Sequence, residues 1–415
     1  MKSVRLLAFE LIYDVIKNNA YSNLSLDSVQ NEVKSADKGF LNALTYGVIE
    51  RKITLDYIIN KFLTGKTKPK VKILLYVGAF QLYFMDKVPS NAAINETVEL
   101  AKQVGCEYYS KLVNAVLHKI DDNRIDIDSI TDLSIRYSCP QQLINMWNKQ
   151  YGEENTFKIL NSLNSVPPVF AVPNKLFVDA DELCYELLSE GAECEAVGEL
   201  VKINSAFDIK NSKAFNNGLF HIEDLSSYNC AKALNAEEGE TVLDVCSAPG
   251  GKAFTVAECM NNDGKVYAFD LHESRVNLIK QGAKRLELSS VVAEVNDASE
   301  FNNKLPLADR ILCDVPCSGF GIIRRKPEIR YRTLDSVADL PELQYKILSV
   351  SSLYLKKGGR IVYSTCTLNK KENEKVVQRF LSDNEGYSLI EEKTVFPEPD
   401  GGDGFYYAVM EKNND

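Results

Sequence analysis

Two cysteines stand directly after short, apolar, β-branched segments that predict strands. Cys317 lies in Asp314-Val315-Pro316-Cys317-Ser318-Gly319, and Cys366 lies in Ser364-Thr365-Cys366-Thr367. In an open α/β sheet, ligands bind outside the carboxyl ends of the strands, so both thiols are expected to reach one crevice. A single buried cysteine is more often an inert apolar side chain than a nucleophile. The shared position at strand ends favours chemistry here.

A thiolate is suited to attack on carbon 6 of cytosine. Addition there makes carbon 5 nucleophilic towards an electrophilic methyl group, so one difficult step becomes several easier ones. A neighbouring positive charge would lower the thiol pKa from about 8.5. An acid near N3 of the base would stabilise the charge that develops, and Asp314 is the natural candidate.

A third strand-end segment, residues 243–252, ends a predicted strand in a glycine turn that opens a helix. Gly250 and Gly251 let the backbone approach a ligand closely, and the helix N-terminus offers free N–H groups. Asp270 ends the next predicted strand, nineteen residues after Gly251, where a carboxylate suits a ribose diol. The segment matches neither G-x-x-x-x-G-K-[ST] nor G-x-G-x-x-G, which disfavours binding of a nucleoside triphosphate.

The elements around these residues alternate between strands and helices, which predicts a doubly wound parallel sheet. The expected strands are 242–245, 266–269, 291–295, 311–313 and 360–363, separated by helices at 253–260, 274–286 and 343–355. Residues 405–410 are expected to close the chain as an edge strand.

The preceding part of the chain has a different pattern. Apolar residues with helical spacing predict an all-helical domain over 1–123, with a buried central helix at 73–84. Residues 124–230 predict a small α+β linker domain, with two short helices around Gly152, and 231–415 form the expected catalytic domain.

Charge and composition narrow the class of protein. The net charge is −10, yet residues 1–120 hold 16 Lys and Arg against 11 Asp and Glu, including a lysine-rich stretch from Lys61 to Lys72. That asymmetry indicates either a nucleic-acid module or a solvated loop. The ten cysteines form no C-x-x-C pair and only three histidines occur, so neither a metal site nor disulfides are expected. No apolar run reaches the ~18 residues of a membrane span. We expect a cytoplasmic protein.

These motifs resemble the family of RNA cytosine-C5 methyltransferases, and most closely its bacterial branch that acts on 16S ribosomal RNA. The two cysteine segments carry the resemblance, together with the glycine turn and Val113-Asn114-Ala115-Val116-Leu117, which is similar to a NusB-like RNA-binding domain. The resemblance implies a Rossmann-like α/β methyltransferase domain with a mainly parallel seven-stranded sheet, preceded by a small α+β linker domain and an all-α NusB-like domain.

The resemblance also implies an activity and a set of site residues. S-adenosylmethionine would be the methyl donor, and the substrate would be cytosine-967 of 16S rRNA, free or in an early small-subunit particle, with the enzyme a monomer that needs no metal or membrane. Cys366 would be the nucleophile and Cys317 would assist proton removal, although cytosine DNA methyltransferases use the cysteine after a proline instead. The expected cofactor-binding residues are Cys246, Ser247, Ala248, Pro249, Gly250, Gly251, Lys252, Asp270, Arg275, Asp297 and Asp314.

A basic segment follows the Cys317 loop. Arg324, Arg325, Lys326 and Arg330 are expected to contact RNA phosphate, the alternative being a solvated charged loop. The chain also departs from the family pattern at Val315 and Phe320 and lacks an arginine expected within 170–174, but no catalytic group is lost.

Three other functions remain open. A transfer RNA cytosine-C5 methyltransferase belongs to the same family, and the NusB-like N-terminal part argues for ribosomal RNA instead, but only by resemblance. An amino-group methyltransferase is disfavoured, because Pro316 is followed by Cys317 rather than by a second proline and an aromatic residue. A non-catalytic RNA-binding or assembly factor is disfavoured by the presence of both cysteines, Lys252 and the aspartates.

Overall fold

The structure is a computed structural model that describes residues 2–18, 20, 22, 26, 29, 32–204 and 207–414. The chain divides into two units: Met1–Ser165 with Ile323–Arg332, and Val166–Ile322 with Thr333–Asp415. The three-part division at residues 123/124 and 230/231 stays a prediction.

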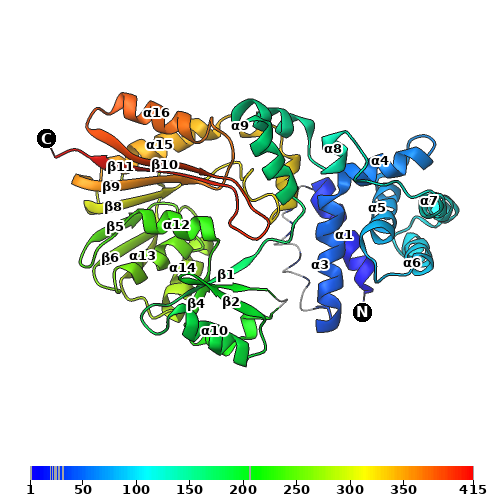
Figure 1. Ribbon diagram of the computed structural model, residues 1–415, viewed down its shortest axis with the longest axis horizontal. Coiled ribbons are helices and arrows are strands. Elements are labelled where there is room, and N and C mark those ends of the chain that lie inside the picture. Colours follow the sequence, from blue (N-terminus) through cyan, green and yellow to red (C-terminus); the bar gives the residue numbers. More distant parts are fainter. Residues whose placement is uncertain are drawn as a thin grey trace. The chain divides into compact units, whose positions relative to one another are not determined.

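The first unit is helical, as its apolar periodicity predicts. At its centre is α5 (Pro69–Phe84), which is buried on every side from Ile73 to Leu82 and packs against α3, α4, α6 and α7 (Figure 1). A helix that is apolar all round must be enclosed by others. The bounds of the helices are α1 Val4–Asn18, α3 Ser35–Glu50, α4 Lys52–Phe62, α6 Ser90–Gln103, α7 Ser110–Asp122, α8 Leu133–Arg136 and α9 Gln141–Ser162. Gly152, with φ 79°, kinks α9 where two helices are expected.

The second unit begins with a small antiparallel sheet. Its strands are β1 (Val169–Pro173), β2 (Cys194–Val197), β3 (Leu200–Ile203) and β4 (Phe220–Ile222), in the order β2-β3-β1-β4. Helices α10 (Ala180–Ser189) and α11 (Lys213–Asn216) cover the apolar face.

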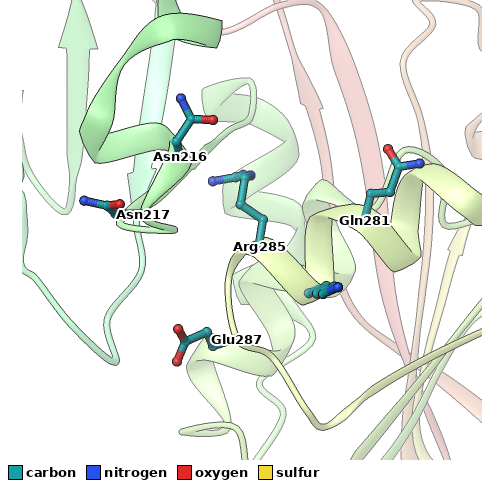
Figure 2. Close-up of a pocket in the computed structure, with 6 residues that line it drawn as sticks. Asn216, Asn217, Gln281, Arg285 and Glu287 are labelled. Carbon is teal, nitrogen blue, oxygen red and sulfur yellow. The ribbon is translucent and has the colours of Figure 1, made fainter.

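Two sets of hydrogen bonds join the small sheet and α11 to residues 285–286. The Asn174 amide donates to the carbonyls of Gly218 at 3.0 Å and Leu286 at 2.8 Å. The Arg285 guanidinium donates to the carbonyls of Phe215 at 2.6 Å and Phe220 at 2.9 Å. Figure 2 shows Arg285 beside a cleft of about 630 Å³ at this junction. The cleft lies at the C-terminal end of α14 (Glu273–Arg285), the end of the helix away from the strand ends that carry the chemistry.

The large sheet has seven strands in the order β10-β11-β9-β8-β5-β6-β7 (Figure 1). Strands β7, β6, β5, β8 and β9 are parallel, whereas β11 is antiparallel to both β9 and β10. The bounds are β5 Thr241–Asp244, β6 Lys265–Asp270, β7 Val291–Val295, β8 Ala308–Asp314, β9 Leu355–Thr365, β10 Tyr387–Val395 and β11 Phe405–Lys412. The doubly wound α/β class predicted from the sequence is confirmed.

Helices cover both faces of this sheet. One face packs against α12 (Leu225–Ala233), α13 (Gly251–Cys259) and α14, and the other against α15 (Leu340–Ser352) and α16 (Glu374–Asp383). No helix in the described ranges is long and apolar enough to cross a membrane.

The expectation that residues 405–410 form an edge strand is wrong. They belong to β11, which is paired on both sides, and β10 is the edge. β10 escaped prediction because its sequence, YSLIEEKTV, is largely exposed and charged, whereas β11 is buried along most of its length. A strand buried on both faces reads as a continuous apolar run, and that property belongs to interior strands.

Candidate active site

The strand order reverses between β5 and β8, because β6 lies on one side of β5 and β8 on the other. Open α/β sheets bind ligands at this point, outside the carboxyl ends of the strands. Asp244 ends β5, Asp270 ends β6, Asp314 ends β8, and Cys366 directly follows β9. Four elements therefore bring the chemistry-bearing residues to one edge of the sheet.

The turn after β5 is shaped by glycine. Gly250 has φ 114°, and a Cβ atom there would lie 2.4 Å from Cζ of Phe254. The Ser247 N–H donates to the Phe269 carbonyl at 2.7 Å, which fixes the turn beside the end of β6. Any side chain at Gly250 would be strained and would clash, so the tight turn requires glycine.

Asp270 and Arg275 border the same turn. The Asp270 carboxylate is buried and lies 3.0 Å from the Arg275 guanidinium, and it accepts from the His272 N–H at 3.1 Å. Arg275 also donates to the Ala248 carbonyl at 2.8 Å, which links α14 to the glycine turn. Asp297 lies beyond β7, where its carboxylate caps the backbone N–H of Ser299 at 2.9 Å and its side chain is exposed.

Asp244 is a site residue that sequence analysis missed. The Asp244 carboxylate is buried, and neither of its oxygens has a hydrogen-bond partner of standard geometry among the described residues, although the neighbouring Ser247 hydroxyl and Cys246 N–H partly stabilise its charge. Burial raises the pKa of Asp244 to about 7, and the negative charge of Asp314 adds to the effect. Unpaired buried acceptors are costly unless a ligand satisfies them. The ammonium group of S-adenosylmethionine fits this requirement, because its N–H groups can donate to the carboxylate.

We predict that cofactor binding depends on the ionisation of Asp244. Because its pKa is raised to about 7, the carboxylate population falls roughly eightfold between pH 7.5 and pH 6, and affinity for S-adenosylmethionine should fall by a similar factor. Asp244→Asn should bind the cofactor at least about tenfold more weakly and with little pH dependence, which calorimetry at the two pH values would measure.

In the ligand-free protein, the same substitution is expected to be favourable, because it should raise stability. A carboxyl with a raised folded-state pKa contributes stability below its ordinary pKa, and the contribution is lost as pH rises through about 7. Asp244→Asn should therefore raise the melting temperature at pH 8 while weakening cofactor binding. A loss of both stability and binding would instead indicate a purely structural aspartate.

Lys252 and Asp314 form an ion pair at the carboxyl end of β8. Lys252 Nζ lies 2.8 Å from Asp314 Oδ2, and the Ser364 hydroxyl donates to Asp314 Oδ1 at 2.9 Å. Burial alone would lower the pKa of Lys252, but the charges of Asp314 and Glu223 outweigh it and raise the pKa, so the side chain stays cationic. The Asp314 side chain remains 27% exposed, so it is held in place yet open to a ligand.

The two cysteines are brought into contact. Cys317 Sγ lies 3.2 Å from Cys366 Sγ, and both are free thiols. The hydrogen bond to Cys366, burial, and the charges of Glu372 and Asp314 together raise the pKa of Cys317 well above the usual range of a thiol. The raised pKa favours the protonated form of Cys317, and the two thiols share a hydrogen bond in which either sulfur can be the donor.

Glu372 is a second residue that sequence analysis missed. Its carboxylate is fully buried and accepts four hydrogen bonds, from the Ser318 N–H at 2.8 Å, the Ser318 hydroxyl at 2.6 Å, Gln344 at 3.0 Å and Asn369 at 2.9 Å. The Ser318 hydroxyl also contacts the Thr367 hydroxyl at 2.7 Å. Glu372 thus ties the residue after Cys317 to the segment after Cys366, and it fixes the spacing of the two thiols.

The basic segment after Cys317 belongs to a different unit of the chain from the two cysteines. Residues 323–332 belong to the helical unit. Arg330 is fully buried and donates to the carbonyls of Glu50 at 2.6 Å, Ser138 at 3.1 Å and Leu163 at 3.3 Å. The expected RNA contact by Arg330 is therefore wrong, because its guanidinium is bound to protein carbonyls away from solvent. Arg324 is buried as well, whereas Arg325 and Lys326 are half-buried.

We predict that Arg330 acts on stability. Arg330→Ala would leave three buried carbonyls without their donor and should destabilise the protein by about 2–4 kcal/mol. Thermal unfolding checks this against Lys326→Ala, which removes a half-buried cation from the same segment and should change the melting temperature little. Equal, small effects of both substitutions would contradict a structural role for Arg330.

The fold and this edge define a class of protein. A mainly parallel seven-stranded sheet with one antiparallel strand inserted near its edge, a glycine turn after the first of its strands, and an acid after the next are the features of an S-adenosylmethionine-dependent methyltransferase.

Comparisons with known proteins agree with this class and narrow it. Residues 231–411 match the family model described as 16S rRNA methyltransferase RsmB/F, and residues 2–122 match the NusB family. The chain is 38% identical to the probable ribosomal RNA small subunit methyltransferase B of Bacillus subtilis, with 99% of both chains covered. It is 30% identical, again over 99% of both chains, to the ribosomal RNA small subunit methyltransferase B of Escherichia coli O127:H6.

One solved structure matches along nearly the whole chain, and another matches about two thirds of it. A crystal structure of PH0851 matches with a TM-score of 0.81 and 26% identity over 99% of both chains. NSun6 from Pyrococcus horikoshii with SFG matches with a TM-score of 0.60 and 21% identity, over 66% of this chain and 99% of that one. The chain belongs to the ribosomal RNA small subunit methyltransferase B family.

Proposed function

We propose that the protein methylates carbon 5 of a cytosine in 16S rRNA, with cytosine-967 as the target, through a covalent bond between Cys366 and carbon 6. The observation that supports this most strongly is the contact of two thiols at 3.2 Å beside Asp314, at the carboxyl ends of β8 and β9. Methyl transfer to oxygen or nitrogen needs no thiol, whereas transfer to carbon 5 needs a nucleophile that activates the ring.

Cys366 is the proposed nucleophile. Its thiolate forms a bond to carbon 6, and the electron pair of the 5,6 double bond moves so that carbon 5 becomes the attacking atom. Asp314 lies beside it, fixed by Lys252 and Ser364, and is placed to stabilise charge at N3 of the base. When bound, S-adenosylmethionine supplies the electrophilic methyl group.

Cys317 is the proposed base for the closing steps. In the free enzyme its raised pKa keeps it protonated, which leaves the partner thiol to act as nucleophile. Once Cys366 is bonded to carbon, the thiol–thiol hydrogen bond that contributes most to the raised pKa of Cys317 is lost, so Cys317 can release its proton to solvent. The Cys317 thiolate then removes the proton from carbon 5, and the bond between carbon 6 and Cys366 breaks as the double bond re-forms.

The glycine turn, Asp270 and Arg275 are proposed to hold the cofactor, together with Asp244. Asp270 suits the ribose hydroxyls, and Asp297 lies one strand further, at the place expected for the adenine. Gly250 and Gly251 allow close approach by the methionine part. The enzyme is proposed to act as a monomer in the cytoplasm, where its RNA substrate is made.

A methylation assay shows whether 16S rRNA or transfer RNA is the substrate. The protein is incubated with tritiated S-adenosylmethionine and unmodified 16S rRNA, either free or in an early small-subunit particle, with transfer RNA in parallel, and the labelled base is mapped. Label on carbon 5 of one rRNA cytosine is the expected result. Label on transfer RNA alone would keep the chemistry and overturn the substrate, and label on no RNA would overturn the proposal.

A further inference from the structure

A group of tyrosine and lysine side chains on the helical unit has no part in the chemistry above. It is formed by the segment that leads into α5 and the segment that leads into α7. We call it the tyrosine–lysine patch, and its members are Lys66, Lys68, Lys70, Tyr108, Tyr109 and Lys111.

Contacts within the structure bring the two segments together. Lys68 Nζ lies 5.5 Å from the centre of the Tyr109 ring, and Lys70 Nζ donates to the Val104 carbonyl at 3.4 Å. The rings of Tyr108 and Tyr109 meet edge to face, with centres 5.1 Å apart. The helices α5, α6 and α7 that carry these segments pack against one another (Figure 1). Lys68 is therefore a neighbour of Tyr109, and Lys70 is a neighbour of the segment that precedes the tyrosines, although both lysines are distant from them in sequence.

Tyr108 is placed in an unusual environment for its type. Its side chain is 89% exposed, although aromatic side chains usually contribute most when buried. Tyr109 packs against the core of the unit, and its ring contacts the ring of Tyr108 edge to face. An aromatic ring held in solvent in this way is available to stack on another flat, apolar surface.

The charge around Tyr108 is positive. Lys66, Lys68, Lys70 and Lys111 are exposed, and no carboxylate lies within ion-pair distance of them in the described part of the chain. The sequence has no Asp or Glu between Asp56 and Asp86, and the acid that accompanies the patch is Glu107. In a protein of net charge −10, such a local excess of cations creates a site for a polyanion.

We infer that the tyrosine–lysine patch binds an unpaired segment of the RNA substrate, with a base stacked on Tyr108 and backbone phosphates at the lysines. Exposed aromatics interleaved with cations suit single strands, because every base has a face for stacking and a duplex hides it. This inference rests on the proposed function only in that the RNA is the substrate rRNA.

Fluorescence anisotropy with a fluorescein-labelled single-stranded RNA of about twelve nucleotides tests the inference. Tyr108→Ala should weaken binding about tenfold, and Tyr108→Phe should retain it, because stacking needs the ring and not the hydroxyl. Tyr185→Ala is the matched control, since Tyr185 on α10 is 72% exposed and lies outside the patch. A combined Lys68→Ala and Lys70→Ala variant should reduce the salt dependence of the logarithm of affinity by about 1.4.

Methylation kinetics complete the test. Tyr108→Ala should raise the KM for rRNA and leave kcat at saturating RNA unchanged, because no residue of the patch is among the groups proposed to carry the chemistry. If Tyr108→Ala binds single strands as tightly as wild type, the inference is overturned and a protein partner becomes the alternative occupant. If wild type methylates no rRNA while Tyr108→Ala still loses affinity for the single strand, the proposed function fails and the patch stands.

Discussion

Cys366→Ala is expected to lose at least about 1,000-fold in kcat, because carbon 5 of cytosine remains unreactive without a thiolate on carbon 6. Cys317→Ala is expected to fail differently. It can still form the bond between Cys366 and the base, but it lacks the base that removes the carbon 5 proton. A covalent RNA–protein complex should therefore accumulate with S-adenosylmethionine present and appear as a slower band on a denaturing gel.

The control for these variants is a thiol pair of similar geometry without a role. Cys184 and Cys194 lie with their sulfurs 3.5 Å apart in the small sheet and α10. Cys184→Ala should methylate at the wild-type rate and trap no complex. If Cys317→Ala is inactive without forming a complex while Cys366→Ala forms one, the two roles are reversed.

Glu372→Gln should reduce kcat about 100-fold while leaving the KM for S-adenosylmethionine within a factor of about two. All four groups that point at the carboxylate are donors. Either orientation of a glutamine amide would set its own N–H groups against two of them, so the Cys317 loop should shift. Displacement of reacting groups by about 1 Å can cost two orders of magnitude in rate.

A second measurement separates positioning from simple loss of structure. The charge of Glu372 is one of the causes that raise the pKa of Cys317, so its removal should lower that pKa. In a Cys366→Ala background, the pH profile of Cys317 alkylation should move to lower pH with Glu372→Gln. Glu374→Gln, two residues further on, is the matched control and should leave the profile in place. An unchanged profile with Glu372→Gln would contradict the positioning role.

Secondary structure could be predicted best from the sequence where a local apolar pattern indicates a buried element. Interior strands such as β5 and β8 are apolar along their length, and the class of the sheet and its strand ends follow from them. The edge strand β10 and the amphipathic helix α16 carry many charges, and neither was predicted. The positions of candidate residues after interior strands could therefore be predicted from the sequence, whereas the elements at the edge of the sheet could not.

The missed site residues share one cause. Asp244 and Glu372 are acids whose roles depend on burial and on donors from other elements, and nothing in their immediate neighbours shows either. Arg330 illustrates the reverse error, since its position in a basic segment indicates solvent exposure while its partners Glu50, Ser138 and Leu163 come from distant parts of the chain. Hydrogen bonds between elements are nonlocal, so local composition cannot predict them.

A substrate that cannot complete the reaction should trap the nucleophile on the RNA and so identify it. Fluorine at carbon 5 replaces the proton that the base must remove, so wild-type protein, S-adenosylmethionine and 16S rRNA containing 5-fluorocytidine should form a stable covalent complex. Mass spectrometry of the digested complex would identify the residue that carries the nucleotide. The account predicts Cys366; a nucleotide on Cys317, or no covalent complex under conditions in which unmodified rRNA is methylated, would contradict it.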